Sequence, residues 1–69
     1  MLAHPTAKII FMTTWLTVAE AAAYIKAKGT GKIREAIHRG ELPAYSYGRE
    51  IRLKAEEIDE WMESHPWEP

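Results

Sequence analysis

TGKIREAIHRGELPAYSYGREIRL, residues Thr30 to Leu53, is the stretch that decides the fold of this 69-residue chain. Apolar residues three and four positions apart, beginning at Ile33, predict a short amphipathic helix over about Gly31–Arg39. Gly40 then supplies a helix stop in the left-handed conformation. The remaining residues alternate between apolar and polar, and Gly48-Arg49 fits a two-residue hairpin turn with glycine first. The stretch therefore predicts a helix followed by a β-hairpin.

Two further helices flank this stretch. The run Thr17–Glu20 has the pattern of a capping box, so we expect a helix that starts at Thr17 and fades by Lys26–Lys28. Another helix is expected over about Ala55–Ser64, with Pro66 ending it. The first two helices, joined by a tight glycine-containing turn, form a helix-turn-helix unit. The predicted fold class is α+β, a small winged helix-turn-helix of about three helices with a two-stranded β-hairpin wing.

The expected core is thin because the chain is short. Residues predicted to be buried are Ile33, Ile37, Ile51, Leu53, Ile58, Trp61 and Met62, with Trp15, Trp61 and Tyr24 as larger anchors. Trp67 lies beyond the last predicted helix and is expected to be exposed.

One domain is predicted over residues 15–65. Residues 1–14 form a tail, either disordered or a loosely docked strand, and residues 66–69 form a C-terminal tail. Two interpretations of the beginning of the chain stay open. Either Met12 is the true start, or Ile9–Phe11 pack onto the domain.

The composition argues against several classes of protein. There is no cysteine, and His4, His38 and His65 lack the spacing of metal ligands, so we expect no disulfide, no metal and no cofactor. No apolar run approaches the roughly 18 residues of a membrane span. We therefore expect no membrane partner and a cytoplasmic location.

Catalytic side chains are also poorly supported. The carboxylates of the last helix lie on a short element with solvated faces, which offers no pocket to shift their pKa values. Ser46 and Ser64 have no His–Asp partners in the pattern. The GTG sequence at residues 29–31 lacks the Lys-Ser/Thr of a phosphate-binding loop. We expect no catalytic residues and no enzyme activity.

Charge is divided unevenly along the chain. Residues 26–54 hold eight Lys or Arg against three Glu, a net charge of +5, whereas residues 55–69 carry −6. The total of −1 hides this division. A bipolar domain can bind phosphate groups through one face, although an ordinary solvated surface would give the same counts.

The predicted helix after Thr30 carries the side chains suited to DNA. Thr30 is expected to cap it, and its first N–H groups can hold a phosphate. Arg34 is the best candidate for bidentate contact with guanine, while Glu35 either accepts from a cytosine amine or pairs with Arg39, the interpretation that we prefer. The predicted DNA-binding residues of this helix are Thr30, Gly31, Lys32, Arg34, Glu35, His38 and Arg39.

The predicted wing supplies a second set, Ser46, Tyr47, Gly48 and Arg49. Arg49 at the tip can enter a narrow minor groove, or it is a solvated turn residue. Tyr45 and Tyr47 can both lie against the sugar-phosphate backbone. We expect one of them to belong to the sheet face or core instead.

Three segments together resemble the excisionase-type branch of the MerR-like winged-helix DNA-binding family: WLTVAEAAAYI, IREAIHRGELPAYSYGREIRL and AEEIDEWM. The resemblance covers about Trp15 to Met62. It implies a recognition helix at about residues 30–39 and a wing centred on Gly48-Arg49. It also implies a protein without catalytic activity that binds several DNA sites side by side, bends DNA and assists an integrase in excising a prophage.

Two departures from the family pattern matter. The turn KAKGTG, residues 26–31, is about one residue longer than in most relatives, which leaves the register of the recognition helix open. Ser46 stands where many relatives have Arg, which implies weaker phosphate binding by the wing.

The leading functional hypothesis is a phage or prophage excisionase, a recombination directionality factor. Its expected partners are double-stranded DNA, a phage integrase, and other copies of the chain attracted head to tail through the basic middle and the acidic C-terminal helix. The alternatives are a small transcriptional regulator of the same fold, and a protein-interaction module that docks on an integrase without reading DNA.

Overall fold

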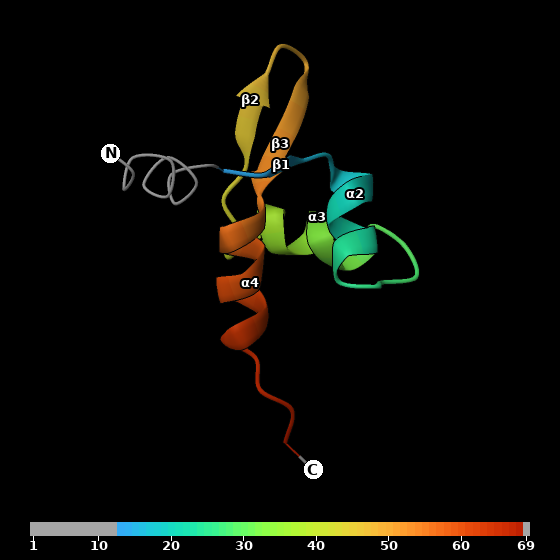
Figure 1. The fold of residues 1–69 in the computed structure, drawn as a ribbon, viewed down its shortest axis with the longest axis vertical. Coiled ribbons are helices and arrows are strands. Elements are labelled where there is room, and N and C mark those ends of the chain that lie inside the picture. Colours follow the sequence, from blue (N-terminus) through green and yellow to red (C-terminus); the bar gives the residue numbers. More distant parts are fainter. Residues whose placement is uncertain (1–12, 69) are drawn as a thin grey trace, which may run out of the picture.

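A computed structural model of the protein describes residues 13–68 (Figure 1). The described elements, in chain order, are β1 (Trp15–Leu16), α2 (Val18–Tyr24), α3 (Gly31–His38), β2 (Tyr45–Tyr47), β3 (Glu50–Lys54) and α4 (Ala55–Glu63). This arrangement confirms the predicted small α+β winged helix-turn-helix. The expectations for Met12 and for Ile9–Phe11 lie outside the described residues.

The sheet contains one more strand than predicted. Strand β3 is central, with β1 and β2 antiparallel on either side of it. Pairing of Tyr47 with Glu50 leaves Gly48 and Arg49 as the two-residue turn, and Gly48 has a positive φ of 60°, as its place in the turn requires. Strand β1 was missed because two residues are too few to show a period of two.

Helix α2 begins as predicted and ends earlier. The Thr17 side chain accepts from the Glu20 backbone N–H at 3.0 Å, and a Glu20 carboxylate oxygen accepts from the Thr17 N–H at 2.9 Å, which confirms the capping box. The helix was expected to fade by Lys26–Lys28, and its last residue is Tyr24, with Ile25 as the C-cap.

The early end of α2 is a Schellman motif built on a lysine. Lys26 has a positive φ of 60°, and the Ala27 N–H donates to the Ala22 carbonyl at 2.8 Å. Glycine usually takes that position, so the lysine hides the stop from sequence analysis. Gly40 ends α3 with the same motif and a φ of 77°, as predicted.

Aliphatic side chains from every layer form the core. Ile33 (α3), Leu42 (the α3–β2 connection), Leu53 (β3) and Ile58 (α4) are the largest fully buried residues. Small residues complete the core and let α2 approach α3 closely: Val18, Ala21, Ala22 and Ala36. Leu42 was not among the residues predicted to be buried.

The expected large anchors lie at the edge of this core. Trp15 and Tyr24 are each 48% exposed and Met62 is 46% exposed, so their predicted burial is wrong. Trp61 packs partly buried against the core, and Trp67 is 84% exposed as predicted. The core of aliphatic residues is already filled, and the Tyr24 hydroxyl stays at the surface, where it donates to Asp59 at 2.8 Å. None of the helices that the structure describes is both long and apolar enough to cross a membrane.

Candidate nucleic-acid interface

Helix α3 divides its polar residues between two flanks. Its buried face is centred on Ile33 and Ala36. One flank, with Arg34 and His38, borders the hairpin residue Ile51, and the other, with Lys32 and residues 35 and 39, borders α4. The seven residues predicted to bind DNA on this helix share its exposed side, opposite Ile33 and Ala36, and spread across both flanks.

The hairpin and α3 enclose an open hollow that we call the wing groove. It is lined by Arg34, Arg49, Glu50, Ile51 and Arg52 together with residues 17–19 at the start of α2. Arg52 Nη2 pairs with a Glu50 carboxylate oxygen at 2.8 Å. Within residues 13–68, no ion pair involves Arg34 or Arg49, so the wing groove keeps two guanidinium groups available for phosphate or base edges.

Thr30 occupies the predicted N-cap position of α3, but its side chain does not cap the helix. Its backbone is already in the helical region, at φ −94° and ψ −1°, and its side chain makes no capping hydrogen bond, so the predicted side-chain cap is wrong. A capping residue normally needs an extended backbone. The Thr30 hydroxyl instead accepts from Arg34 Nε at 3.3 Å. It therefore helps to orient the arginine at the wing groove.

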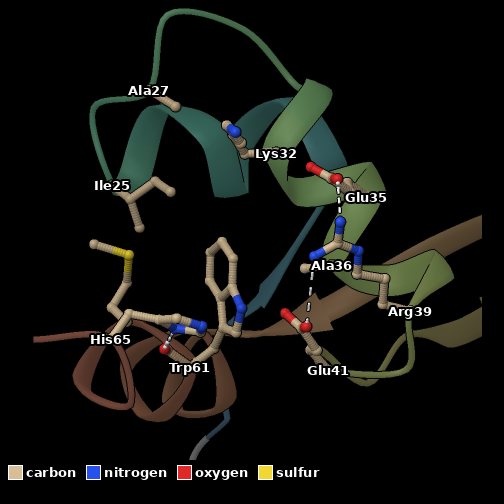
Figure 2. A pocket seen from close by; sticks show the side chains of 10 residues that line it. Ile25, Ala27, Lys32, Glu35, Ala36, Arg39, Glu41, Trp61 and His65 are labelled. Carbon is tan, nitrogen blue, oxygen red and sulfur yellow. Dashed lines mark hydrogen bonds and ion pairs between the residues drawn. The ribbon is translucent and has the colours of Figure 1, made fainter.

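The opposite flank of α3 forms a groove with α4 and the end of α2, shown in Figure 2. Arg39 pairs with Glu35 at 2.8 Å and approaches Glu41 at 3.9 Å. The preferred interpretation of Glu35 as an ion-pair partner is thus confirmed. Both side chains of the closer pair are about half exposed or more, so it contributes only a few tenths of a kcal/mol.

The remaining recognition-helix residues are solvent-facing. Lys32, Arg34 and His38 are exposed, as is Gly31, where an added Cβ atom would meet nothing within 4 Å. Gly31 is therefore not needed for internal packing.

The tip of the wing is also exposed. Ser46, Gly48 and Arg49 face solvent, and Tyr47 is 66% exposed. Tyr45, on the same face of the strand as Tyr47, is the one that is partly buried within the protein. Its hydroxyl donates to the Glu57 carboxylate at 3.0 and 3.1 Å, and that hydrogen bond raises its pKa above 10.0.

Sequence reasoning missed two basic residues of these surfaces. Arg52 was not among the predicted binding residues, yet it lines the wing groove, and its guanidinium lies 4.9 Å from the centre of the Tyr47 ring. Lys28 shares a shallow hollow with Gly29, Gly31 and Lys32 at the start of α3. The signal was present in the sequence, since Lys28 and Lys32 flank the glycine-rich turn and Arg52 pairs across the hairpin with a tyrosine.

Chemistry other than binding has little support in this geometry. Among the residues that the structure describes, no three His, Cys, Asp or Glu side chains come together in a way that could hold a metal ion. The acidic residues of α4 at positions 56, 59, 60 and 63 are exposed, and Glu57 is half-buried against Tyr45.

Comparison with known proteins gives one match. Residues 15–66, more than half of the chain, match a family described as helix-turn-helix domain. Comparisons with curated proteins and with solved structures gave no match. The matched range contains every described helix and strand, and both sides of the wing groove.

Proposed function

This chain belongs to the helix-turn-helix domain family of DNA-binding domains, and we propose that it is a phage or prophage excisionase. In this role it binds attachment-site DNA at adjacent sites, bends it, and directs an integrase toward excision. The family membership supports sequence-specific DNA binding, and the resemblance of three segments to MerR-like excisionases supports the narrower role.

One observation carries the DNA-binding geometry. Arg34 of α3 and Arg49 of the hairpin tip line the same open groove. With α3 in a major groove, the hairpin reaches the neighbouring minor groove of the same duplex. Arg34 then reads a base edge, for which guanine offers two acceptors, and Arg49 reads the width and charge of the minor groove.

The surrounding residues fix the position of the protein along the duplex. Lys28 and Lys32 at the start of α3, and His38 at its end, suit phosphate contacts. Gly31 lets the backbone approach the duplex closely. Ser46 and the hydroxyl of Tyr47 contact the backbone beside the wing tip. Glu35 and Arg39 largely neutralise each other and add little net charge.

Simultaneous contact by helix and wing supports bending, because a duplex held at two neighbouring grooves follows the curvature of the protein. The charge division supports cooperative loading, since a basic region of +5 can attract an acidic region of −6 on the next copy. Such a contact joins different surfaces, so it continues along DNA instead of closing into a dimer.

The test is a gel-shift titration on attachment-site DNA from the protein's own locus, against a scrambled duplex of equal length at matched salt. The proposal predicts a ladder of specific, cooperative complexes that Arg34→Ala weakens. Lys26→Asn is the matched control, because it removes one positive charge from a residue outside the grooves described, and Asn tolerates the left-handed backbone.

Three results would count against the proposal in different ways. A single specific complex at a promoter would indicate a small MerR-like transcriptional regulator. Equal affinity for both duplexes, unchanged in Arg34→Ala, would indicate a module that docks on an integrase without reading DNA. Specific binding without stimulation of excision by the integrase would remove the excisionase role and leave the DNA-binding function.

A further inference from the structure

The sheet has an outer face that none of the described helices α2, α3 and α4 covers and that the DNA-binding geometry does not use fully. Tyr45 pairs with Arg52 and Trp15 pairs with Lys54 across the strands, so these four side chains lie on the same face of the sheet. Trp15 and Tyr45 meet edge to face at 5.3 Å. Lys54 Nζ lies 5.6 Å from the Trp15 ring centre and 5.0 Å from that of Tyr45.

This face contains an aromatic hollow lined by Trp15, Tyr45, Ser46, Tyr47 and Arg52. Its surface is mainly apolar, and two of its aromatic side chains, Trp15 and Tyr47, are about half exposed or more. Exposed tryptophan, tyrosine and arginine in one cluster are typical of the centres of binding sites for protein segments. Within the described chain, the charged ends of Lys54 and Arg52 lie near these rings, and no apolar side chain from a helix is packed on Trp15 or Tyr47.

A nucleic acid is a poor occupant of this hollow. Glu50 pairs with Arg52 at 2.8 Å, and Glu57 accepts from the Tyr45 hydroxyl, so two carboxylates border the same face. Two acidic and two basic groups leave no net positive charge to attract a phosphate backbone. An aromatic segment fits the lining better, and Lys54, which makes no ion pair within residues 13–68, can receive one carboxylate beside it.

Such a segment follows α4 on this chain. Pro66, Trp67 and Glu68 extend away from the end of α4, on the opposite side of the molecule from the hairpin (Figure 1). Trp67 is 84% exposed, more than any other large hydrophobic side chain described. A proline that restricts the backbone beside an aromatic anchor lowers the entropy lost on docking into an aromatic-lined groove.

We propose that the tail of one copy, Pro66–Glu68, docks in the aromatic hollow of a second copy. Trp67 packs between the Trp15 and Tyr47 rings, and Glu68 faces Arg52 and Lys54. Tail and hollow lie on opposite sides of the molecule, so each docked copy still offers one tail and one hollow. The inference rests on the proposed function for its purpose, since it names the contact that joins neighbouring copies on DNA.

The first experiment needs no DNA. A labelled synthetic peptide, SHPWEP (residues 64–69), is titrated into full-length Trp67→Ala protein, whose own tail lacks the anchor, and amide chemical shifts are followed. The proposal predicts saturable binding with shifts at Trp15, Tyr45 and Tyr47. The same peptide with alanine for tryptophan should bind at least tenfold more weakly. Absence of binding, or shifts confined to the groove between α3 and α4, would overturn the proposal.

The second experiment measures cooperativity on duplexes with one site and with two adjacent sites. Trp67→Ala and Trp15→Ala should each keep wild-type affinity for the single site and bring the cooperativity factor close to one. An equal mixture of the two variants should restore cooperative pairs, since one intact tail still meets one intact hollow. Wild-type cooperativity in Trp67→Ala, or no restoration in the mixture, would contradict a tail-to-hollow contact.

Folding controls separate the possible failures. Trp15→Phe keeps an aromatic ring and should retain most of the cooperativity, whereas Met62→Ala removes an exposed apolar side chain elsewhere and should change nothing. If the protein shows no specific DNA binding but the peptide still binds, the proposed function fails and the tail contact stands. If DNA binding is specific and the peptide does not bind, the tail contact fails and the proposed DNA-binding function stands.

Discussion

Arg34 Nε donates a hydrogen bond to Thr30 Oγ1 at 3.3 Å across the first turn of α3. The threonine before the recognition helix thus orients a side chain at the wing groove instead of capping the helix. Thr17, by contrast, forms both hydrogen bonds of a capping box. Two threonines in equivalent positions before two helices therefore have different functions.

This difference gives the first prediction. Thr17→Ala should lower the free energy of unfolding by about 1 kcal/mol, as expected for loss of a capping side chain. Thr30→Ala should cost clearly less, because no cap is lost. Urea denaturation of the two variants measures both values. Equal losses would show that Thr30 caps α3 in solution.

The two arginines of the wing groove should respond differently to substitution. Arg34→Ala should cost about 1–3 kcal/mol of binding free energy on the specific site and relax specificity at one position. Arg49→Ala should weaken binding to all sequences. It should also reduce the slope of log binding constant against log salt concentration by about one. Titrations at several salt concentrations separate these effects. Unchanged binding of both variants would remove the wing groove as the interface.

Gly31→Ala separates folding from binding at one residue. An added Cβ meets nothing within 4 Å, and no positive φ prevents the change. The free energy of unfolding should stay equal or rise by up to about 1 kcal/mol, since alanine restricts the unfolded chain and favours helix. DNA affinity should fall, because the new methyl group stands between the backbone and the duplex. Gly29→Ala, also with open space around it, is the matched control.

Two apolar residues of α4 should differ in their contribution to stability. Ile58 is fully buried, so Ile58→Ala should cost about 2–5 kcal/mol, a large share of the stability of a domain this size. Met62 is 46% exposed, and Met62→Ala should cost much less. Thermal unfolding of the pair tests the burial directly. A larger loss in Met62→Ala would indicate that Met62 is buried in solution, as the sequence predicted.

Two tyrosines predict a dependence on alkaline pH. Hydrogen bonds to Asp59 and Glu57 raise the pKa values of Tyr24 and Tyr45 above the ordinary value of 10.0. Their contribution to stability is therefore complete below pH 10 and is lost as the pH rises through the folded-state values. Tyrosinate absorbance should appear at a higher pH in the folded protein than in the denatured chain. Tyr45→Phe should remove part of this shift to higher pH. The absence of any shift in the wild-type protein would contradict both hydrogen bonds.

Sequence analysis reached the fold because its strongest signals were local. The capping box at Thr17, the glycine at 40 and the glycine in the hairpin turn each specify backbone geometry by themselves. The end of α2 was misplaced because Lys26 adopts a conformation that glycine normally signals. Strand β1 depends on pairing with β3, far away in the sequence, and no local pattern marks it.

The candidate interface was predictable residue by residue but not as an arrangement. Arg34 and Arg49 were chosen for their chemistry, and their meeting in one groove depends on how the hairpin folds over α3. The ion pair of Glu35 with Arg39 followed from helical spacing. Arg52 escaped notice although the predicted two-residue turn at Gly48-Arg49 already places it opposite Tyr45.

The pairing of β1 with β3 has a consequence for how the chain folds. Trp15 and Leu16 pair with Lys54 and Leu53, so α2, α3 and β2 all lie inside the loop that these two residue pairs close. Closing so long a loop costs entropy before its contacts stabilise it, and the sheet should therefore form late and slow folding below the rate of a helical bundle of equal size. Hydrogen exchange at Leu16 should then follow global unfolding.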